Sequence, residues 1–540
     1  MNAVDDIELV GAPWAVLIDA GARIDKDSAI TGRLAALLAA LGIEVADPDA
    51  HVPRVDAMTV GIFGHPHDPI AGCHAWWVGL GDCPSWMQRA RGHGAHGAIE
   101  IVSLLGSGFE QERAGVAFRS AGRGEAIPSA SVYEADAILG GIDDAVAVRK
   151  AAVTAIKATP TSRTAVLARS AQILASVCTK GGAIAASTQA APDAPDYWFF
   201  WLRDSAHCAA ALATVGADDL LERYLGFVEE LGLRLERHKA GVGVSRCTMD
   251  GEPLEGYGNP QWDGPAATAL VVLSVVHDSD RALRIARPYL DGIIESLDAP
   301  PSYDLWELRV GHSFHALNLT RRALRKAALV ASNSSLVARY QESEAECLAR
   351  LAEHRNSEKG TVDCNRGSPS AWTQACSGLD MSVIGSALLC YDVSDESFNV
   401  DDPGIAATMA ALDVHYQARW AINDAWSAAG HQGRGIGRFP EDCNDGFGST
   451  GANPWPVTTL WAAQFFARTA QRQSYLGAAT ASIDAAASRA EGYLDFVLAH
   501  GGVGELGEQI DAENGSPVGA RPLAWSHAEL IQTVDAARQL

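Results

Sequence analysis

Apolar residues recur at helical spacing from about residue 160 to the end of the chain. Several of these segments are rich in Ala and Leu nearly all round, which is typical of helices that are covered on two sides. Twelve such helices form six hairpins, which predict a closed α/α toroid, although periodicity alone also fits an open solenoid. The helices are expected near 162–177, 204–214, 217–238, 264–277, 280–296, 311–330, 334–355, 379–391, 402–429, 455–471, 480–500 and 523–539.

Residues 1–155 show a different pattern, because short apolar runs typical of buried strands replace the long periodic segments. We therefore expect a mainly α protein: an (α/α)6 barrel over 156–540, preceded by a smaller N-terminal domain of α/β or α+β type whose role the sequence does not assign. Strands are expected at 15–19, 43–45, 60–63 and 98–102, and a helix at 32–41.

Four potential metal ligands lie close together in the N-terminal region: His65, His67, Cys73 and His74. Their spacing matches no recognised zinc pattern, so a loop rich in Gly, Pro and His is the favoured interpretation.

The ten cysteines form no C-x-x-C pair, which favours reduced thiols in a cytoplasmic protein over a disulfide framework. The segment from Met1 to Asp6 carries no basic region followed by an apolar core, as a secretory signal would, and no apolar run is long enough for a membrane span. We expect a cytoplasmic location.

The formal net charge is −24, with 66 acidic against 42 basic residues. This balance argues against nucleic acids and against anionic membrane surfaces as partners, since both require an excess of Lys and Arg. A small neutral ligand meets no such repulsion.

Carboxylates recur in the segments that lead into every second predicted helix, at steps of 59, 44, 73, 61 and 67 residues. In a closed double ring these segments share one face, whereas a solenoid would spread them along a groove. Seven of the fourteen tryptophans lie in or beside the same segments, which together suggest a carbohydrate site. The carboxylates are Asp204, Asp263, Glu307, Asp380, Glu441 and Glu508, and the tryptophans are Trp198, Trp201, Trp262, Trp306, Trp372, Trp455 and Trp525.

Glycoside hydrolysis requires two carboxyl groups, one to protonate the leaving oxygen and one to activate water or attack the sugar. Glu307 is the best candidate for the acid, because its apolar neighbours, including Trp306, favour the protonated carboxyl. The bland alternative is a carboxylate in a first helical turn. For the second group, the Gly-rich segment near the C-terminus offers both Glu505 and Glu508.

Two Arg–Asp motifs are ambiguous. Arg203 and Asp204 follow an aromatic run, where the pair can grip sugar hydroxyls or form a buried ion pair that ties down a helix start. Arg438, four residues before Asp442, carries the same ambiguity.

These residues fall in segments that resemble glycoside hydrolase family 15, the group of glucoamylases, glucodextranases and bacterial trehalases. The resemblance covers about residues 160–540, and the segments follow the family order. They are PDYWFFWLRDSA from Pro195, YGNPQWDGPA from Tyr257, YDLWELRVGHSF from Tyr303, SGLD from Ser377, RFPED from Arg438, GANPW from Gly451, GEQ from Gly507 and PLAWSHA from Pro522.

The resemblance implies an (α/α)6 barrel and an exo-acting, anomer-inverting hydrolase that releases β-D-glucose from non-reducing ends without a metal or other cofactor. It assigns Glu307 as the general acid and selects Glu508 over Glu505 as the general base. The residues expected to bind the substrate are Tyr197, Trp201, Arg203, Asp204, Tyr257, Trp306, Arg309, Arg438 and Gln509.

Two departures from the family pattern fall where the leaving sugar should lie. Leu308, followed by Arg309, stands where fungal glucoamylases have a second Glu, and Tyr257 replaces a usual Trp. We therefore expect a short α-1,6-linked substrate such as isomaltose rather than starch.

Three alternatives to this prediction differ in kind. A trehalase or a hydrolase of another α-linked hexoside remains open, and so does a non-catalytic carbohydrate-binding or regulatory relative, although such a protein needs neither Glu307 nor Glu508. A terpene cyclase needs a D-D-x-x-D metal motif, which the pairs at 143–144 and 401–402 do not complete.

Overall fold

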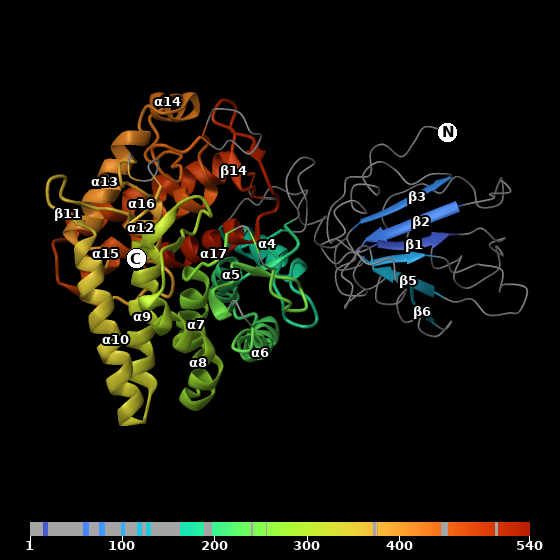
Figure 1. Cartoon of the computed structure of the whole chain (residues 1–540). Coiled ribbons are helices and arrows are strands. Elements are labelled where there is room, and N and C mark those ends of the chain that lie inside the picture. Colours follow the sequence, from blue (N-terminus) through green and yellow to red (C-terminus); the bar gives the residue numbers. More distant parts are fainter. Residues whose placement is uncertain are drawn as a thin grey trace, which may run out of the picture.

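The computed structural model describes six strands of the N-terminal region and most of the chain from residue 163 onward (Figure 1). The described ranges after the strands are 163–187, 197–238, 241–254, 256, 258–370, 374, 376–443, 452–502 and 506–539.

Six helices form a closed inner ring in which each helix contacts the next and the last contacts the first. The closed ring decides between the toroid and the open solenoid that periodicity alone left open. In ring order the helices are α5 (Leu202–Thr214), α7 (Asp263–Val275), α9 (Phe314–Val330), α12 (Met381–Gly385), α15 (Pro456–Tyr475) and α17 (Ala524–Arg538).

Six further helices pack against this ring: α4 on α17, α6 on α5, α8 on α7, α10 on α9, α13 on α12 and α16 on α15. Inner and outer helices alternate along the chain, and Figure 1 shows the paired α7 and α8 running alongside each other. The predicted (α/α)6 barrel is thereby confirmed. The outer helices are α4 (Arg163–Ser176), α6 (Asp218–Leu235), α8 (Ser279–Glu295), α10 (Ser334–Glu353), α13 (Pro403–Tyr416) and α16 (Thr480–His500).

The sequence of each helix fits its layer. In the inner helix α7 every residue from Asp263 to Leu273 is buried, and its many Ala residues allow neighbouring helices to approach closely. The outer helix α8 buries one stripe that includes Ala282, Ile285 and Tyr289. Its opposite face carries Arg side chains that form surface ion pairs with α6. The apolar pattern of each helix therefore matches its layer: α7 is buried on all sides, and α8 is buried on one side.

Two predicted helices differ from the observed ones. The segment 402–429 forms two helices, α13 and α14 (Ala421–Ala428), because the side-chain amide of Asn423 donates to the carbonyl of Tyr416 at 2.8 Å. In a continuous helix that carbonyl would accept from the amide of Trp420. The predicted helix 379–391 is reduced to α12, which ends at Gly385, a poor helix former that packs against the Trp461 ring.

The described strands of the N-terminal region form one sheet in the order β3-β2-β1-β4-β5-β6. The pair β1–β4 is parallel and the other neighbours are antiparallel. Three strands match expected ones, whereas β3, β5 and β6 were not predicted. The expected strand 43–45, the helix 32–41 and the group from His65 to His74 lie outside the described residues, and the domain boundary at 155 stays a prediction. The strands are β1 (Ala15–Asp19), β2 (Met58–Phe63), β3 (Ala75–Leu80), β4 (Ile99–Val102), β5 (Val116–Ser120) and β6 (Ala126–Ala130).

Short strands in the loops before the inner helices position the candidate site. They pair as β7–β8, β9–β10–β13, β11–β12 and β14–β15. Within the described parts of the chain, no helix combines the length and the apolar character that crossing a membrane requires. The strands are β7 (Phe200–Trp201), β8 (Arg246–Cys247), β9 (Ser302–Tyr303), β10 (Val310–Ser313), β11 (Arg355–Asn356), β12 (Thr361–Val362), β13 (Asn365–Arg366), β14 (Gln509–Ile510) and β15 (Pro517–Val518).

Candidate active site

The predicted carboxylates lie at or before the N-termini of inner helices. Asp204 is in the first turn of α5, Asp263 is the first residue of α7, and Asp380 caps α12 by accepting a hydrogen bond from the amide of Ser382 at 2.6 Å. The positive end of each helix dipole favours a carboxylate at these positions. Glu307 and Glu508 lie in the loops that lead into α9 and α17.

Glu307 occupies the turn between β9 and β10, so the alternative of a carboxylate in a first helical turn is wrong. Its backbone has φ of 60°, in the left-handed region that residues other than Gly rarely adopt. Such a conformation costs about 1–3 kcal/mol and persists where the surroundings enforce it, often at functional sites. Here Asp304 enforces it, since its carbonyl accepts from the amide of Glu307 and its carboxylate accepts from the amides of Leu308 and Arg309.

Neighbouring side chains hold the carboxyl group of Glu307 at Oε1. Trp201 Nε1 donates to Oε1 at 3.1 Å, and a guanidinium nitrogen of Arg203 lies 3.6 Å from the same oxygen. The other oxygen faces Gly258, where a Cβ would approach Oε2 to 2.9 Å. The side chain is 15% exposed, so one oxygen is fixed while a partner molecule can still approach the group.

Glu508 has a corresponding environment. The hydroxyl of Tyr197 donates to Oε1 at 2.9 Å, and a Cβ at Gly519 would lie 2.8 Å from Oε2. Burial raises the pKa of Glu508, whereas the hydrogen bond from Tyr197 and the charge of Arg438 act in the opposite direction. Glu505 lies outside the described residues.

One short segment therefore holds both carboxyl groups. Tyr197 and Trp201, whose ring centroids are 5.7 Å apart, donate to Glu508 and Glu307 respectively. Burial, followed by the charge of Glu508, raises the pKa of Tyr197 well above its usual value, and Glu307 contributes to the same effect. Two carboxyl groups that are far apart in sequence are thus anchored by one pair of neighbouring aromatic side chains.

Arg203 and Asp204 extend this group of charges. Arg203 contacts Asp204 at 3.2 Å and donates to Gln261 at 3.0 Å, and both members of the pair are 6% exposed. Burial raises the pKa of Asp204, and the charge of Arg203 opposes this rise. Asp204 Oδ2, the atom that lies 3.2 Å from the Arg203 guanidinium, has no hydrogen-bond partner among the described residues, and a carboxylate oxygen can accept from more than one donor. The ion pair is present, and the grip on sugar stays a prediction.

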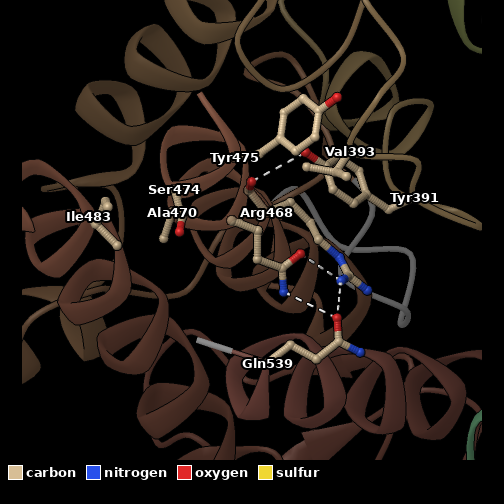
Figure 2. A pocket seen from close by; sticks show the side chains of 9 residues that line it. Tyr391, Val393, Arg468, Ala470, Ser474, Tyr475, Ile483 and Gln539 are labelled. Atoms are coloured by element: carbon tan, nitrogen blue, oxygen red, sulfur yellow. Dashed lines mark hydrogen bonds between the residues drawn. The ribbon is translucent and has the colours of Figure 1, made fainter. Parts of the chain in front are cut away.

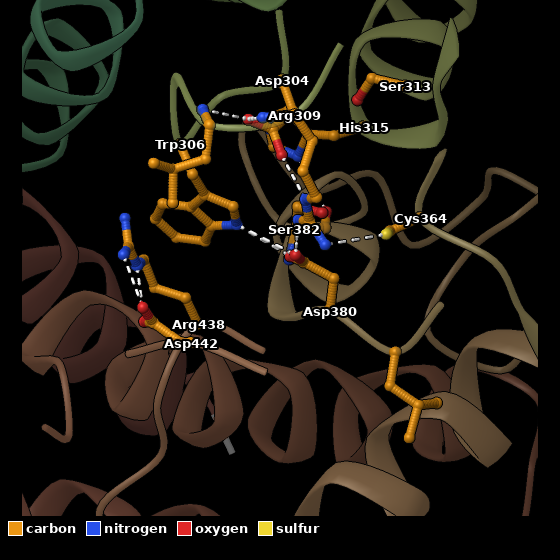
Figure 3. A network of polar contacts seen from close by, with 12 residues as sticks. Asp304, Trp306, Arg309, Ser313, His315, Cys364, Asp380, Ser382, Arg438 and Asp442 are labelled. Atoms are coloured by element: carbon orange, nitrogen blue, oxygen red, sulfur yellow. Dashed lines mark hydrogen bonds and ion pairs between the residues drawn. The ribbon is translucent and has the colours of Figure 1, made fainter. Parts of the chain in front are cut away.

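Trp306 forms the buried back of the site. Its ring nitrogen donates to Asp380 at 2.9 Å, and its ring packs against Trp455 and Trp525 with centroid distances of 5.8 and 6.2 Å. Figure 3 shows Arg438 beside this ring, with its guanidinium 5.5 Å from the Trp306 centroid.

The Arg438 guanidinium is already engaged by two hydrogen bonds to Asp442, each 2.8 Å long. This bidentate ion pair fixes the guanidinium plane against the aromatic cluster. Contact of Arg438 with the substrate stays a prediction.

The environment of Arg309 argues against the predicted contact with substrate. Its side chain is 1% exposed, and it pairs with both Asp304 and Asp380 (Figure 3). Its guanidinium also lies 4.2 Å from the Phe439 ring centroid. These contacts tie the Glu307 turn to the N-terminus of α12, so Arg309 acts here as a positioning residue, and its contact with substrate stays a prediction.

Two other predicted residues give less information. Gln509 is completely buried on β14, where Oε1 accepts from Asn453 at 3.1 Å and Nε2 has no hydrogen-bond partner among the described residues. Tyr257 lies outside the described residues. Among those that are described, no group of three or more His, Cys, Asp or Glu side chains is arranged to hold a metal ion, and the absence of a cofactor stays an expectation.

Sequence reasoning gave no role to Asp304, Gly258 or Gly519. Asp304 stands in the stretch around Glu307, but a sequence does not show that its carboxylate turns back onto the following amides. The glycines carry no local signal, because the need for a missing Cβ arises from carboxyl oxygens that are distant in sequence.

Replacing Tyr197 by Phe removes the hydrogen bond that lowers the pKa of Glu508. As the predicted base, Glu508 must be ionised, so the loss of enzyme activity at low pH should begin at a higher pH in this variant. We expect the acidic limb of the profile of kcat/KM against pH to shift upward, with a lower kcat at neutral pH. An unchanged acidic limb in a folded variant would show that Glu508 does not control it.

The closed double ring of helices, with paired carboxylates in the loops of its inner helices, defines the class as a six-hairpin glycosidase-like toroid. The sequence profile of Glycosyl hydrolases family 15 matches residues 161–535, and the chain belongs to this family.

Curated relatives include the intracellular sporulation-specific glucoamylase of Saccharomyces cerevisiae, 27% identical over 307 residues that cover 50% of this chain and 55% of the yeast protein. The probable glucoamylase of Schizosaccharomyces pombe is 23% identical over 394 residues, which cover 63% of this chain and 82% of that protein. The match covers 55% of the sporulation-specific enzyme and 39% of the Saccharomyces cerevisiae glucoamylases S1 and S2. The chain therefore spans about half, or less, of the length of these relatives.

Solved structures show the same fold. The glucoamylase from Saccharomycopsis fibuligera superposes with a TM-score of 0.63 at 21% identity, covering 70% of this chain and 96% of that one. The Hormoconis resinae glucoamylase gives a TM-score of 0.60 at 21% identity, covering 69% and 73%.

Proposed function

We propose that this protein is an exo-acting, anomer-inverting α-glucoside hydrolase that releases β-D-glucose from the non-reducing end of short oligosaccharides. The observation that carries the proposal is the shared anchoring of Glu307 and Glu508 by Trp201 and Tyr197. A binding protein without turnover needs neither an acid nor a base in this arrangement. Membership of a glycosyl hydrolase family and the similarity to glucoamylases support the same conclusion.

In this mechanism Glu307 protonates the glycosidic oxygen while Glu508 removes a proton from the attacking water. Trp201 holds one oxygen of Glu307, so the oxygen beside Gly258 is the one that delivers the proton. Tyr197 holds one oxygen of Glu508 in the same way and leaves the oxygen beside Gly519 to orient water. Water attacks the anomeric carbon from the face opposite the departing sugar, which inverts the configuration and gives β-D-glucose.

Arg203 and Asp204 would bind the hydroxyls of the terminal sugar. Their fixed, buried positions lower the cost of ordering these side chains when the sugar binds.

We further propose that the substrate is α-1,6-linked. Leu308 is 41% exposed next to Glu307, and the family resemblance implies that the leaving sugar lies at this position. An apolar residue there offers no acceptor to the hydroxyls of the leaving sugar, which disfavours a ligand that relies on such bonds. We also propose a cytoplasmic location, in agreement with one curated relative that is named intracellular.

A panel of α-linked disaccharides tests the proposed activity. Isomaltose, maltose and trehalose are incubated with the enzyme, and free glucose is measured over time. We expect the highest kcat/KM for isomaltose. Release from trehalose alone would make the protein a trehalase, and no release from any substrate would contradict the proposed activity.

Replacing Leu308 by Glu should move the preference toward α-1,4 linkages. The new carboxylate would accept hydrogen bonds from the leaving sugar, and one such bond to a charged group contributes about 1.5–3 kcal/mol. We expect the ratio of kcat/KM for maltose to that for isomaltose to rise about tenfold or more. The exposed Leu336→Glu on α10 is the matched control, and an unchanged ratio in Leu308→Glu would remove this residue from linkage selection.

A further inference from the structure

A pocket of about 430 Å³ is lined by side chains that come from several helices (Figure 2). Its walls come from the C-terminal half of α15, the segment after α12, the start of α16 and the end of α17. From Pro456 at the active-site end of α15 to Arg468 in this pocket, the helix advances about 18 Å at 1.5 Å per residue. The lining residues that matter here are Tyr391, Arg468, Gln471, Ser474 and Gln539.

Arg468 is a buried cation in this pocket. Its side chain is 8% exposed, its Nε has no hydrogen-bond partner among the described residues, and NH1 donates to the side-chain oxygens of Gln471 and Gln539 at 2.8 and 3.2 Å. These partners are neutral. Burial lowers the pKa of Arg468, and the charge of Asp535 opposes this effect.

Two other buried arginines of the inner helices have a carboxylate in contact, whereas Arg322 is satisfied by backbone carbonyls instead. Arg321 pairs with Asp395 at 2.7 Å, and Arg472, one turn beyond Arg468, pairs with Asp401 at 2.9 Å. Within the described residues, Arg468 has no carboxylate within ion-pair distance.

The carboxylate with the largest effect on Arg468 is that of Asp535, which accepts from the side-chain amide of Gln539 at 2.7 Å. Buried charges are normally paired, so an unpaired guanidinium that lines a cavity is suited to an anion supplied from outside.

The surroundings of Arg468 favour a small oxyanion. The Tyr391 ring supports the guanidinium from 5.1 Å, and the exposed Ser474 places a hydroxyl at the rim of the same pocket. A planar guanidinium with free donors matches the oxygens of a phosphate group. The net charge of −24 repels large polyanions, and the cavity volume is at the lower end of the range for small-molecule sites.

We propose that this pocket, centred on Arg468, binds the phosphate group of a small molecule, either inorganic phosphate or a hexose phosphate. The site is separate from the candidate active site, so its ligand and the sugar substrate can be bound at the same time.

Isothermal titration calorimetry of the full chain, in a buffer without phosphate and with saturating glucose present, tests this proposal. The probes are inorganic phosphate and glucose 6-phosphate. Binding of either at one site per chain is expected, and tighter binding of glucose 6-phosphate would identify an organic phosphate as the ligand. No binding of either probe would overturn the proposal.

Two variants locate the site. Ser474→Glu places a negative charge at the rim without disturbing the core, and Arg468→Gln removes the cation. Each should weaken binding at least about tenfold. Leu476→Glu adds the same charge at the same end of α15, but its side chain is 59% exposed and outside the pocket, so it should bind as the wild type does. Unchanged affinity in a folded Ser474→Glu variant would also overturn the proposal.

Discussion

Replacing Glu307 by Gln is expected to lower kcat on isomaltose by about 10²–10⁴-fold, the usual contribution of a general acid. Gln keeps the size of the side chain and an oxygen that accepts from Trp201, so the strained turn at Glu307 should persist. What is lost is the proton for the glycosidic oxygen. Circular dichroism and thermal unfolding would verify that the variant folds as the wild type does.

The leaving group provides a sharper test of the Glu307 role. α-Glucosyl fluoride releases a fluoride ion, which requires far less protonation than a sugar alkoxide. The Glu307→Gln variant should therefore retain much more of its wild-type rate on the fluoride than on isomaltose. Equal losses on both substrates would mean that Glu307 does not act as the acid.

The same substitution at Glu508 should reduce kcat by a similar factor, about 10²–10⁴-fold, but on both substrates. Gln at this position can still accept from the Tyr197 hydroxyl, whereas it cannot take a proton from water. Because water must attack whichever group departs, a better leaving group does not compensate for the missing base.

The two variants thus differ in their rates on the fluoride: a better leaving group restores activity to Glu307→Gln but not to Glu508→Gln. The loss of activity on isomaltose alone does not distinguish the two roles. A folded Glu508→Gln variant with near-wild-type activity would remove this residue from the mechanism. Glu353, an exposed carboxylate on α10, provides the control, since Glu353→Gln should leave both rates unchanged.

Much of the barrel could be predicted from the sequence because each helix layer leaves its own apolar pattern. The all-round burial of α7 and the single stripe of α8 follow directly from the positions of Ala, Ile and Val. The break between α13 and α14 could not be predicted, because it depends on the side chain of Asn423 bonding to a carbonyl seven residues away. In the N-terminal region short apolar runs located β1, β2 and β4 only.

The candidate site, like the barrel, could be predicted from the sequence only in part. The regular steps between carboxylates in the sequence predicted their places before the inner helices. The structure shows that Glu307 and Glu508 are both anchored by the segment that holds Tyr197 and Trp201. The tryptophan pattern was less specific than it appeared, because Trp306, Trp455 and Trp525 pack against one another as buried structure.

Contacts between distant segments were out of reach for sequence reasoning. Arg309 follows the Glu307 turn in the sequence, but its ion pair with Asp380 of α12 appears only when the ring closes. The glycines beside the two carboxyl groups were missed for the same reason. Each must lack a side chain because a carboxyl oxygen from a distant part of the sequence lies against it.

Proton NMR of the first product is the most direct test of the central claim that Glu307 and Glu508 act as acid and base in an inverting hydrolysis. The enzyme is mixed with isomaltose, maltose or trehalose, and the anomeric signals are followed before mutarotation. We expect the first glucose to be the β-anomer. If α-glucose forms first, configuration is retained, and Glu508 cannot act as a base through water.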